Sequence, residues 1–302
     1  MKNNYINDIY PYLTDNLKKA LESSKDDFIE NLCEIRITIE KPVMADVSGK
    51  LLYLECNKER IIADKIMIDK IVDNVTNGSL YSVNDSIKNG FVTVKGGHRI
   101  GFCGTAVSDM NEIRHIKNIS SICIRIAKEL KGCALPLFEE LFLNGRVCDV
   151  LIASPPGCGK TTLLRDICRL LGNGSLGYGF VKVGIADERN EIAAVYNSVA
   201  QNDIGISSFV CNGYEKSVAL QMMLRSMSPD VLVTDEIGSD IDFHAIQLAK
   251  NSGVSVIASA HASCFEELKS KYMGRLKNFD IIVILKGKGK IDKIYRRKNN
   301  DY

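Results

Sequence analysis

Hydrophobic and polar residues follow two different patterns along this chain, and the pattern changes near residue 131. In the first part, short segments alternate strictly between apolar and polar residues. Segment 34–40, EIRITIE, places Ile35, Ile37 and Ile39 on one face and polar side chains on the other. Segment 119–130, ISSICIRIAKEL, repeats this alternation. A period of two predicts strands that bury one face and leave the other toward solvent.

Helical segments and a hairpin accompany these strands. Apolar residues recur at helical spacing in segment 10–24, and a second helix is expected around 64–76. Two short strands flank Gly96-Gly97 and predict a hairpin. Because segment 131–136, KGCALP, then breaks the pattern, we expect a smaller mixed α/β domain over residues 1–130.

Beyond this junction, continuously apolar segments alternate with helical ones. The expected strands are VCDVLIA (147–153), FVKVGIA (180–186), DVLVTDE (230–236), GVSVIASAH (253–261) and FDIIVILK (279–286). Helices are expected around 160–171, 214–227, 240–251 and 264–277. Apolar strands joined through helices are typical of a parallel sheet with both faces covered. The sequence therefore predicts a parallel-sheet domain over residues 131–302.

Composition and charge narrow the possible functions. The 302 residues carry a formal net charge of +2, which indicates neither a nucleic-acid nor a membrane partner. Basic residues gather between Lys286 and Lys298, where a solvated edge hairpin and tail are favoured over a binding patch. The ten cysteines form no C-x-x-C pair and the four histidines are scattered, so reduced core cysteines are expected rather than zinc ligands. No apolar run is long enough to span a membrane and the first residues lack a signal-peptide core, which predicts a cytosolic protein.

Residues 154–162, SPPGCGKTT, differ at one position from the phosphate-binding pattern G-x-x-x-x-G-K-[ST]. Ser154 takes the place of the first glycine, at a loop entry that needs a small residue more than glycine itself. The loop joins an expected strand to the N-terminus of an expected helix, where backbone N–H groups and the helix dipole favour phosphate. Lys160 is expected to reach the β- and γ-phosphates, and Thr161 to bind magnesium. The nucleotide-binding candidates are Ser154, Pro155, Pro156, Gly157, Cys158, Gly159, Lys160, Thr161 and Thr162.

Two acids, Asp235 and Glu236, stand at the carboxyl end of the expected strand 230–236. In a parallel sheet, ligands bind at this edge. Asp235 is the candidate magnesium ligand, directly or through water, and Glu236 is the candidate that orients the attacking water or accepts its proton. The pair could instead cap the next helix. Together with the glycine-rich loop, however, it predicts an α/β fold with a P-loop NTPase (RecA-like) parallel-sheet domain after the smaller mixed α/β domain.

Two further expected strand ends add polar groups to the same edge. GIADERNE leaves Glu188 after one strand, and IASAHAS leaves His261 after another. His261 is a candidate γ-phosphate sensor, because a neutral imidazole can donate one hydrogen bond toward phosphate or its water. The plainer alternative is a loop residue near a helix start, since Ser263 and Glu266 have the spacing of a capping box.

An arginine could also act in catalysis, because phosphoryl transfer spreads negative charge that a guanidinium stabilises. The candidates are Arg189, Arg225 and Arg275, and Arg225 lies shortly before the strand that carries the two acids. Each could instead be an ordinary surface or salt-bridge residue. The sequence does not decide whether such an arginine acts in its own subunit or in a neighbour.

Taken together, these segments resemble the stage III sporulation protein AA family, ATPases of endospore-forming bacteria related to the ring-forming motors of type II secretion and type IV pili. The resemblance covers nearly the whole chain. It rests on EIRITIEKP, GGHRIGFCGTAV, ISSICIRIAKE, SPPGCGKTTLLRD, ADERNEIA, LRSMSPDVLVTDEIG and ASAHA, in this order. It implies that the segment with Asp187 and Glu188 matches the acidic box of that superfamily, and the segment with His261 the histidine box.

The resemblance further implies an ATPase that uses ATP and Mg²⁺ and forms a homo-oligomer, expected to be a hexamer. In such a ring the N-terminal domain packs beside the motor domain of a neighbour. The partner would be a membrane-embedded subunit of a channel complex between mother cell and forespore, with the ATPase on the cytoplasmic, mother-cell side. One departure is that Asp235 is kept, whereas many secretion ATPases lack this aspartate. The division of catalytic work between Glu236 and the acidic box therefore stays open.

Two other functions compete with a motor. A nucleic-acid-dependent ATPase would need a basic face, which Arg36, Lys95, His98 and Arg99 could offer. Against it, the first domain lacks an aromatic-rich strand and the net charge is near neutral, so nucleic acid is an unlikely partner. The third possibility is a nucleotide-binding protein that hydrolyses nothing, which Glu236 beside Asp235 argues against. No base-reading motif distinguishes ATP from GTP.

Overall fold

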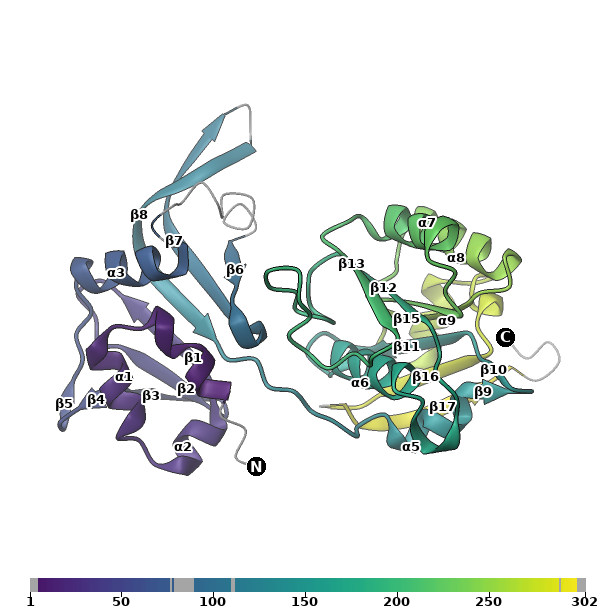
Figure 1. The fold of residues 1–302 in the computed structure, drawn as a ribbon, viewed down its shortest axis with the longest axis horizontal. Coiled ribbons are helices and arrows are strands. Elements are labelled where there is room, and N and C mark those ends of the chain that lie inside the picture. Colours follow the sequence, from purple (N-terminus) through teal and green to yellow (C-terminus); the bar gives the residue numbers. More distant parts are fainter. Residues whose placement is uncertain (1–4, 77, 79–89, 110–111, 288, 298–302) are drawn as a thin grey trace. The chain divides into compact units, whose positions relative to one another are not determined.

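A computed structural model describes residues 5–76, 78, 90–109, 112–287 and 289–297. The chain forms two compact units, residues 1–128 and 129–302 (Figure 1). The first unit has one hydrophobic core, and the second has one on each face of its sheet. The second unit begins two residues before the boundary expected from the sequence. Glu129 belongs to it because its Oε1 accepts a hydrogen bond from the backbone N–H of Asp203 at 2.8 Å.

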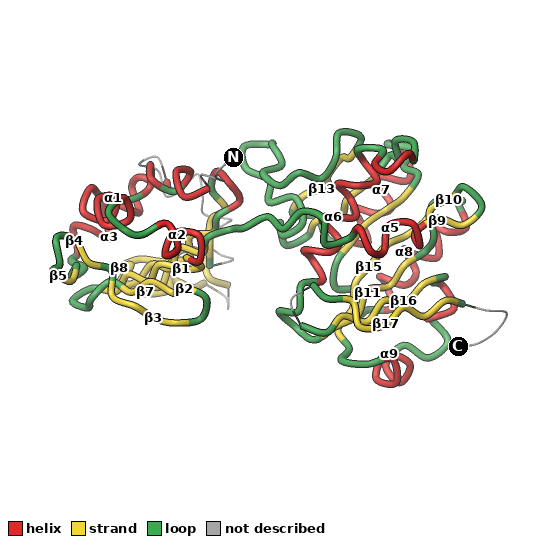
Figure 2. Tube along the Cα trace, turned by 90° about the horizontal axis from the view of Figure 1, so that it is seen from below, coloured by secondary structure: helices red, strands yellow, loops and turns green. Residues whose placement is uncertain are grey.

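The first unit contains a six-stranded antiparallel sheet in the order β3-β2-β1-β8-β7-β6. Its strands are β1 (Leu32–Thr38), β2 (Met44–Val47), β3 (Lys50–Tyr53), β6 (Phe91–Thr93), β7 (Arg99–Asp109) and β8 (Glu112–Arg125), and a small hairpin is made by β4 (Glu55–Cys56) and β5 (Glu59–Arg60). Its helices are α1 (Asp15–Glu22), α2 (Asp26–Asn31) and α3 (Lys65–Thr76), with 3-10 turns η1 (Tyr5–Asp8), η2 (Tyr10–Tyr12) and η4 (Lys95–Gly97). The α-helices lie over one face of the sheet (Figure 2).

The strict alternation of β1 explains which face the helices cover. Ile35 and Ile37 are fully buried, and the strand register places Ile35 beside Ile124 of β8, which in turn faces Ile100 of β7. These buried rows form the core on which α3 packs. Arg36, one residue out of phase, points to the opposite, exposed face. The period of two therefore predicted the buried face of this sheet correctly.

The second unit contains a seven-stranded sheet in the order β13-β12-β14-β15-β11-β16-β17. Its strands are β11 (Val150–Ser154), β12 (Val183–Asp187), β13 (Ser208–Asn212), β14 (Val231–Thr234), β15 (Ser255–His261), β16 (Ile281–Leu285) and β17 (Ile291–Arg296), and a separate hairpin is made by β9 (Phe142–Leu143) and β10 (Arg146–Val147). The first six strands of the sheet are parallel, and β17 pairs antiparallel with β16. The helices are α5 (Leu135–Phe138), α6 (Lys160–Gly172), α7 (Lys216–Ser226), α8 (Asp240–Asn251) and α9 (Phe265–Lys271), with 3-10 turns η5 (Glu139–Leu141), η6 (Ser175–Gly177) and η7 (Leu276–Asn278).

Both faces of the five central strands are buried, as the continuously apolar segments predicted. Along β11, Val150 and Ile152 belong to one core, which includes α6. The intervening Leu151 and Ala153 belong to the other core, which includes α7, α8 and α9. The centre of the sheet is therefore covered by helices on both sides, while the edge strands β13 and β17 are partly exposed.

Several expected elements differ in length from the structure. The strand predicted over 180–186 begins only at Val183. The strand predicted over 147–153 begins only at Val150, because Val147 pairs instead with Phe142 in the β9–β10 hairpin. The helix predicted over 264–277 ends at Lys271, because Gly274 takes a positive φ of 78° and the chain then forms η7. The expected basic hairpin at the sheet edge corresponds to β16 and β17, while Lys298 lies outside the described residues.

The end of α6 meets the loop before β13 at a close backbone contact. A Cβ atom on Gly172 would lie 2.6 Å from Ser208 Oγ and 3.0 Å from Gly205 Cα. Since real Cβ contacts are longer than this, a side chain at Gly172 would push the two segments apart. This glycine fixes how closely α6 packs on the edge of the sheet.

Strand order decides which side chains can meet at the carboxyl edge of the sheet. β15 lies between β11 and β14, and β12 lies on the far side of β14. The ends of β11, β15 and β14 therefore bring the glycine-rich loop, His261 and the Asp235–Glu236 pair to neighbouring positions. Among the residues whose positions are given, no helix is long and apolar enough to cross a membrane.

Candidate nucleotide site

The glycine-rich loop joins β11 directly to α6. Gly157 and Gly159 have φ values of 73° and 92°, a left-handed conformation that glycine adopts without steric cost. Ser154, in contrast, is the last residue of β11 and pairs in register with His261. Because Ser154 has extended strand backbone, this position does not require glycine, and its departure from the phosphate-binding pattern leaves the loop conformation possible.

Helix α6 begins at Lys160, immediately after the left-handed Gly159. The first N–H groups of a helix have no partners within the helix and carry partial positive charge. They converge here with the loop backbone at the carboxyl edge of the sheet, a standard geometry for binding a phosphate. Of the other loop residues, Pro156 and Gly157 are exposed, and Pro155, Cys158, Thr161 and Thr162 are half-buried.

Lys160 is buried, and three acceptors surround its ammonium. Nζ lies 3.1 Å from the carbonyl oxygen of Ser154, 3.2 Å from that of Pro155 and 3.0 Å from Nδ1 of His261. Burial lowers the pKa of this ammonium, while the nearby charge of Glu236 acts in the opposite direction. The lysine is thus held inside the loop by neutral acceptors that a phosphate oxygen could replace.

His261 connects the two predicted motifs. An ammonium can only donate, so Nδ1 of His261 accepts from Lys160 and the ring proton resides on Nε2. Nε2 lies 3.1 Å from Oε1 of Glu236, to which it donates. The neutral imidazole therefore bridges Lys160 of the glycine-rich loop and Glu236 at the end of β14, as the place of β15 between β11 and β14 allows.

Glu236 has a backbone conformation that few side chains adopt. Its φ is 46°, in the left-handed region. Its N–H donates to Ser259 Oγ at 3.0 Å, and its carbonyl oxygen accepts from Lys216 Nζ at 3.1 Å. Its carboxylate also forms an ion pair with Nη1 of Arg189 at 2.5 Å. Such a conformation costs free energy in a residue with a side chain, so the contacts around Glu236 hold it in place.

Asp235 is almost completely buried, and its Oδ2 finds no hydrogen-bond partner among the described residues. Burial raises the pKa of this carboxyl to about 7, and the charges of Asp187, Glu191 and Glu236 act in the same direction. A buried carboxylate oxygen without a partner suits a divalent cation, because Mg²⁺ is usually held by one or two protein oxygens together with nucleotide phosphates. The unpartnered Oδ2 of Asp235 therefore suits the predicted role of this residue as a magnesium ligand.

The two acids at the end of β12, Asp187 and Glu188, have different roles. Asp187 is buried, and its carboxylate accepts backbone hydrogen bonds from Glu191 and Ala193 at 2.7 and 2.8 Å and a further one from Ile192. These bonds fix the loop that follows β12. Glu188 is exposed and pairs with Lys216 Nζ at 3.2 Å. Within this segment, Glu188 rather than Asp187 presents its charge to the site.

The arginine candidates lie in different places. Arg189 contacts Glu236, as described above. Arg225 is exposed in the last turn of α7, nine residues after Lys216 and therefore about 14 Å farther along the helix. The structure does not bring it to the site of its own chain. Arg275 forms an ion pair with Asp240 and lies over the ring of Phe243, so it serves the packing of α8.

Sequence reasoning missed Lys216, which contacts both Glu188 and Glu236. No motif marked it, because it is a lone lysine at the start of a predicted helix. The predicted capping box was wrong: the helix begins at Phe265, and Ser263 hydrogen-bonds Glu267 instead of Glu266. A capping box does occur at the start of α8, where Ser239 and Asp242 bond reciprocally.

The basic face considered for nucleic acid does not assemble in the first unit. His98 is buried, its Nδ1 accepts from the N–H of Ala127 at 3.0 Å, and its Nε2 donates to the carbonyl of Tyr5. Arg36 pairs with Glu34, and Lys95 pairs with Asp8. Arg99 is half-buried, with its guanidinium over the ring of Phe91. Each of the four side chains is thus buried, paired with an acid or packed on an aromatic ring.

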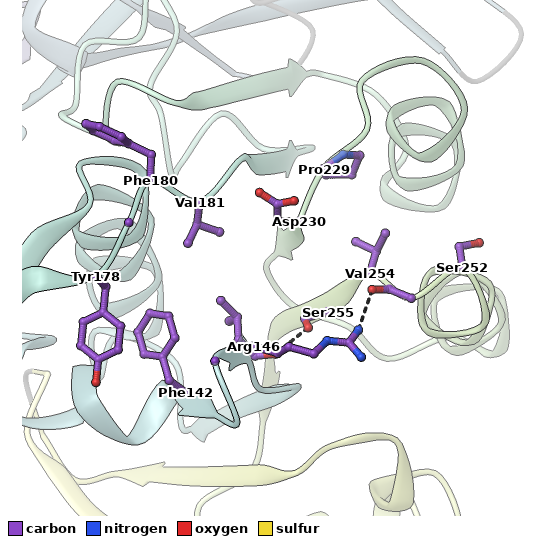
Figure 3. A pocket seen from close by; sticks show the side chains of 14 residues that line it. Phe142, Arg146, Tyr178, Phe180, Val181, Pro229, Asp230, Ser252, Val254 and Ser255 are labelled. Carbon is purple, nitrogen blue, oxygen red and sulfur yellow. Dashed lines mark hydrogen bonds between the residues drawn. The ribbon is translucent and has the colours of Figure 1, made fainter.

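A cavity of about 490 Å³ lies at the opposite, amino edge of the parallel sheet (Figure 3). In this view the rings of Phe142 and Tyr178 lie side by side, with centroids 3.9 Å apart. Arg146 donates to the carbonyl oxygen of Gly253 at 2.9 Å. None of the lining residues is a predicted site residue, so the cavity is separate from the glycine-rich loop. They are Phe142, Gly145, Arg146, Val147, Tyr178, Gly179, Phe180, Val181, Pro229, Asp230, Ser252, Gly253, Val254 and Ser255.

A parallel sheet with a glycine-rich loop between β11 and α6, preceded by an antiparallel-sheet unit, defines this chain as a P-loop NTPase fold. Two solved structures share the fold. The X-ray structure of the Legionella pneumophila ATPase DotB matches with a TM-score of 0.55 and 18% identity, over 89% of this chain and 75% of that one. The pilus retraction motor PilT with bound ADP matches with a TM-score of 0.56 and 15% identity, over 85% of this chain and 75% of that one.

Within this class, the chain belongs to the family Sporulation stage III, protein AA, which matches residues 3–301. It is 36% identical to the stage III sporulation protein AA of Bacillus subtilis (strain 168) over 302 residues. That match covers 98% of this chain and 96% of the relative. The resemblance found in the sequence is confirmed.

Proposed function

We propose that this protein is an ATPase that binds ATP with Mg²⁺ at the glycine-rich loop and powers a secretion-like channel complex between mother cell and forespore. The observation that carries the proposal is the convergence of Lys160, His261, Glu236 and Asp235 at one edge of the parallel sheet. Membership of the sporulation family supports the biological setting, and the shared fold of DotB and PilT supports a secretion or pilus type of ATPase.

In this proposal, the chain supplies binding, orientation and a proton acceptor. Lys160 exchanges its contacts with two carbonyls and His261 for β- and γ-phosphate oxygens, while the N–H groups at the start of α6 bind the same phosphates. Asp235 and Thr161 would hold Mg²⁺, which supplies electrostatic stabilisation of the phosphate charge. Glu236 orients the attacking water and accepts its proton. Once Lys160 has left His261, the imidazole acts as the γ-phosphate sensor and keeps its contact with Glu236.

Oligomerisation is the second part of the proposal. Arg225 lies on the surface of α7, away from the site of its own chain, and could complete the site of a neighbour in a homohexamer. Such a ring would stay on the cytoplasmic, mother-cell side and reach the membrane through an embedded subunit. Nucleic acid is not proposed as a partner, because the basic residues considered for it are buried, paired with acids or, for Arg99, packed on an aromatic ring.

The nucleotide site is tested by ATP binding and phosphate release with the Lys160→Ala protein. We expect both to be lost, because the ammonium is the side-chain cation inside the loop. Lys182→Ala serves as the matched control, since Lys182 is exposed and pairs with Asp230 at the opposite edge of the sheet. Normal hydrolysis by Lys160→Ala would show that the site has been placed wrongly.

The ring is tested by light scattering after size exclusion, using the Glu236→Gln protein with and without Mg-ATP. A hexamer that forms with the nucleotide supports a ring motor and an arginine that acts in a neighbour. A protein that binds ATP and remains a monomer contradicts the proposed homohexamer. Stimulation of ATP hydrolysis by DNA or RNA that falls steeply with salt would favour the nucleic-acid-dependent alternative.

A further inference from the structure

Lys216 contacts the acidic residues that follow two neighbouring strands. It is the first residue of α7, and its side chain is only 14% exposed. Its Nζ lies 3.2 Å from Oε2 of Glu188, which follows β12, and 3.1 Å from the carbonyl oxygen of Glu236, which follows β14. Because β12 and β14 are adjacent in the sheet, one ammonium links the loops that carry the two acids.

The helix itself does not favour a lysine at this position. A positive charge at a helix N-terminus opposes the helix dipole, and the first turn of α7 contains no acidic residue. Enclosing the ammonium adds a desolvation cost. The acceptors that offset both effects, Glu188 and Glu236, lie outside the helix. The placement of Lys216 therefore serves the edge of the sheet rather than the stability of α7.

Glu236 is the residue that most depends on this link. Its left-handed backbone, with a φ of 46°, is held on one side by Ser259 Oγ and on the other by Lys216. The direction of a side chain follows the conformation of its backbone. Lys216 therefore acts on the backbone of Glu236, while Arg189 and Nε2 of His261 contact its carboxylate directly.

We propose that Lys216 is a positioning residue for ATP hydrolysis, which holds Glu236 in its left-handed conformation by bridging its carbonyl oxygen to Glu188. The inference rests on the proposed function, because it assigns Glu236 the role of proton acceptor. Among the described residues, the hydrogen bond and ion pair of Lys216 go to Glu236 and Glu188 and none goes to the glycine-rich loop, while its charge lowers the pKa of the neighbouring Asp235. We therefore assign its main effect to the chemical step and leave phosphate binding to Lys160 and α6.

The test compares Lys216→Met, Lys216→Arg and wild type in steady-state and single-turnover ATP hydrolysis, together with binding of ATP. Lys216→Met is expected to lower kcat and the single-turnover rate by about 10- to 100-fold, the effect of losing a hydrogen bond made by a charged group. KM and ATP affinity should change less than about 3-fold, since only transition-state interactions are lost. Lys216→Arg, which keeps a charged donor, should restore at least part of the rate. Lys182→Met is the matched control and should behave as wild type.

The outcomes separate this inference from the proposed function. A wild-type protein that does not hydrolyse ATP, or a Lys160→Ala protein that does, contradicts the proposed function itself. If wild type and Lys160→Ala behave as proposed, unchanged kcat in Lys216→Met overturns the positioning role alone. A higher KM with unchanged kcat also overturns it, because Lys216 would then act in binding. If Lys216→Met does not fold, Lys216→Gln takes its place, and the same split between kcat and KM decides.

Discussion

Replacing Asp235 with asparagine should stabilise the nucleotide-free protein, and the gain should grow with pH. Burial, followed by the charges of Asp187, Glu191 and Glu236, raises the pKa of Asp235 from an ordinary 3.8 to about 7. In the folded protein this carboxyl therefore stays protonated at pH values where the unfolded chain has already ionised. The stability that Asp235 contributes is complete below its unfolded pKa and is lost as the pH rises through its folded pKa.

The size of the effect follows from the two pKa values. Ionising Asp235 costs about 4 kcal/mol more in the folded protein than in the unfolded chain, because each unit of pKa difference corresponds to about 1.36 kcal/mol. An asparagine of the same shape never ionises. Asp235→Asn should therefore raise the free energy of unfolding by about 2 kcal/mol at pH 5 and by about 4 kcal/mol at pH 8.

Urea unfolding followed by far-ultraviolet circular dichroism, at both pH values and without nucleotide or Mg²⁺, measures this difference. The unit of residues 1–128 is identical in both proteins, so the change reports residues 129–302. Asp292→Asn, at an exposed position of β17, is the control and should change stability by less than about 0.5 kcal/mol at either pH. An equal gain at pH 5 and pH 8, or a loss at pH 8, would refute the reasoning.

Two further predictions concern stability, one within each unit. Burial lowers the pKa of His98, so the stability that this residue contributes is present above its unfolded pKa and is lost as the pH falls through its folded pKa. His98→Gln should therefore make residues 1–128 less sensitive to acid. An unchanged pH profile of unfolding would contradict this. Gly172→Ala should destabilise residues 129–302 by about 1–3 kcal/mol, because the new Cβ would lie 2.6 Å from Ser208 Oγ. Gly179→Ala, where the space is open, is the control in thermal unfolding, and equal melting temperatures of the two variants would show that the contact near Gly172 adjusts freely.

The sequence was most informative where a single period governs a whole segment. The alternation around Ile35 and the apolar run of β11 each depend on local pattern and burial, so these strands and the faces they bury could be predicted. The sequence analysis did not identify β2, β3 or β13. Short hairpins were harder. Val147 is apolar and adjoins a strand, yet it pairs with Phe142, a choice made by tertiary packing rather than by local preference.

The site was predictable to the extent that strand ends in a parallel sheet share one edge. That rule identified Lys160, Glu236 and His261 as neighbours before any coordinates. It could not supply strand order, and strand order is what places His261 between the other two. The role of Asp187 as an acceptor of backbone hydrogen bonds and the contacts of Lys216 depend on loop conformation, for which the sequence carried no periodic signal.

The most direct test of the account is the rate of single-turnover hydrolysis of Mg-ATP by the Glu236→Gln protein, measured together with the affinity of this protein for ATP. The account predicts that the variant binds ATP as wild type does and releases phosphate at least about 100-fold more slowly, because the proton acceptor beside His261 is lost. Phosphate release at the wild-type rate would show that Glu236 does not act on the attacking water, and the central assignment of the site would be wrong.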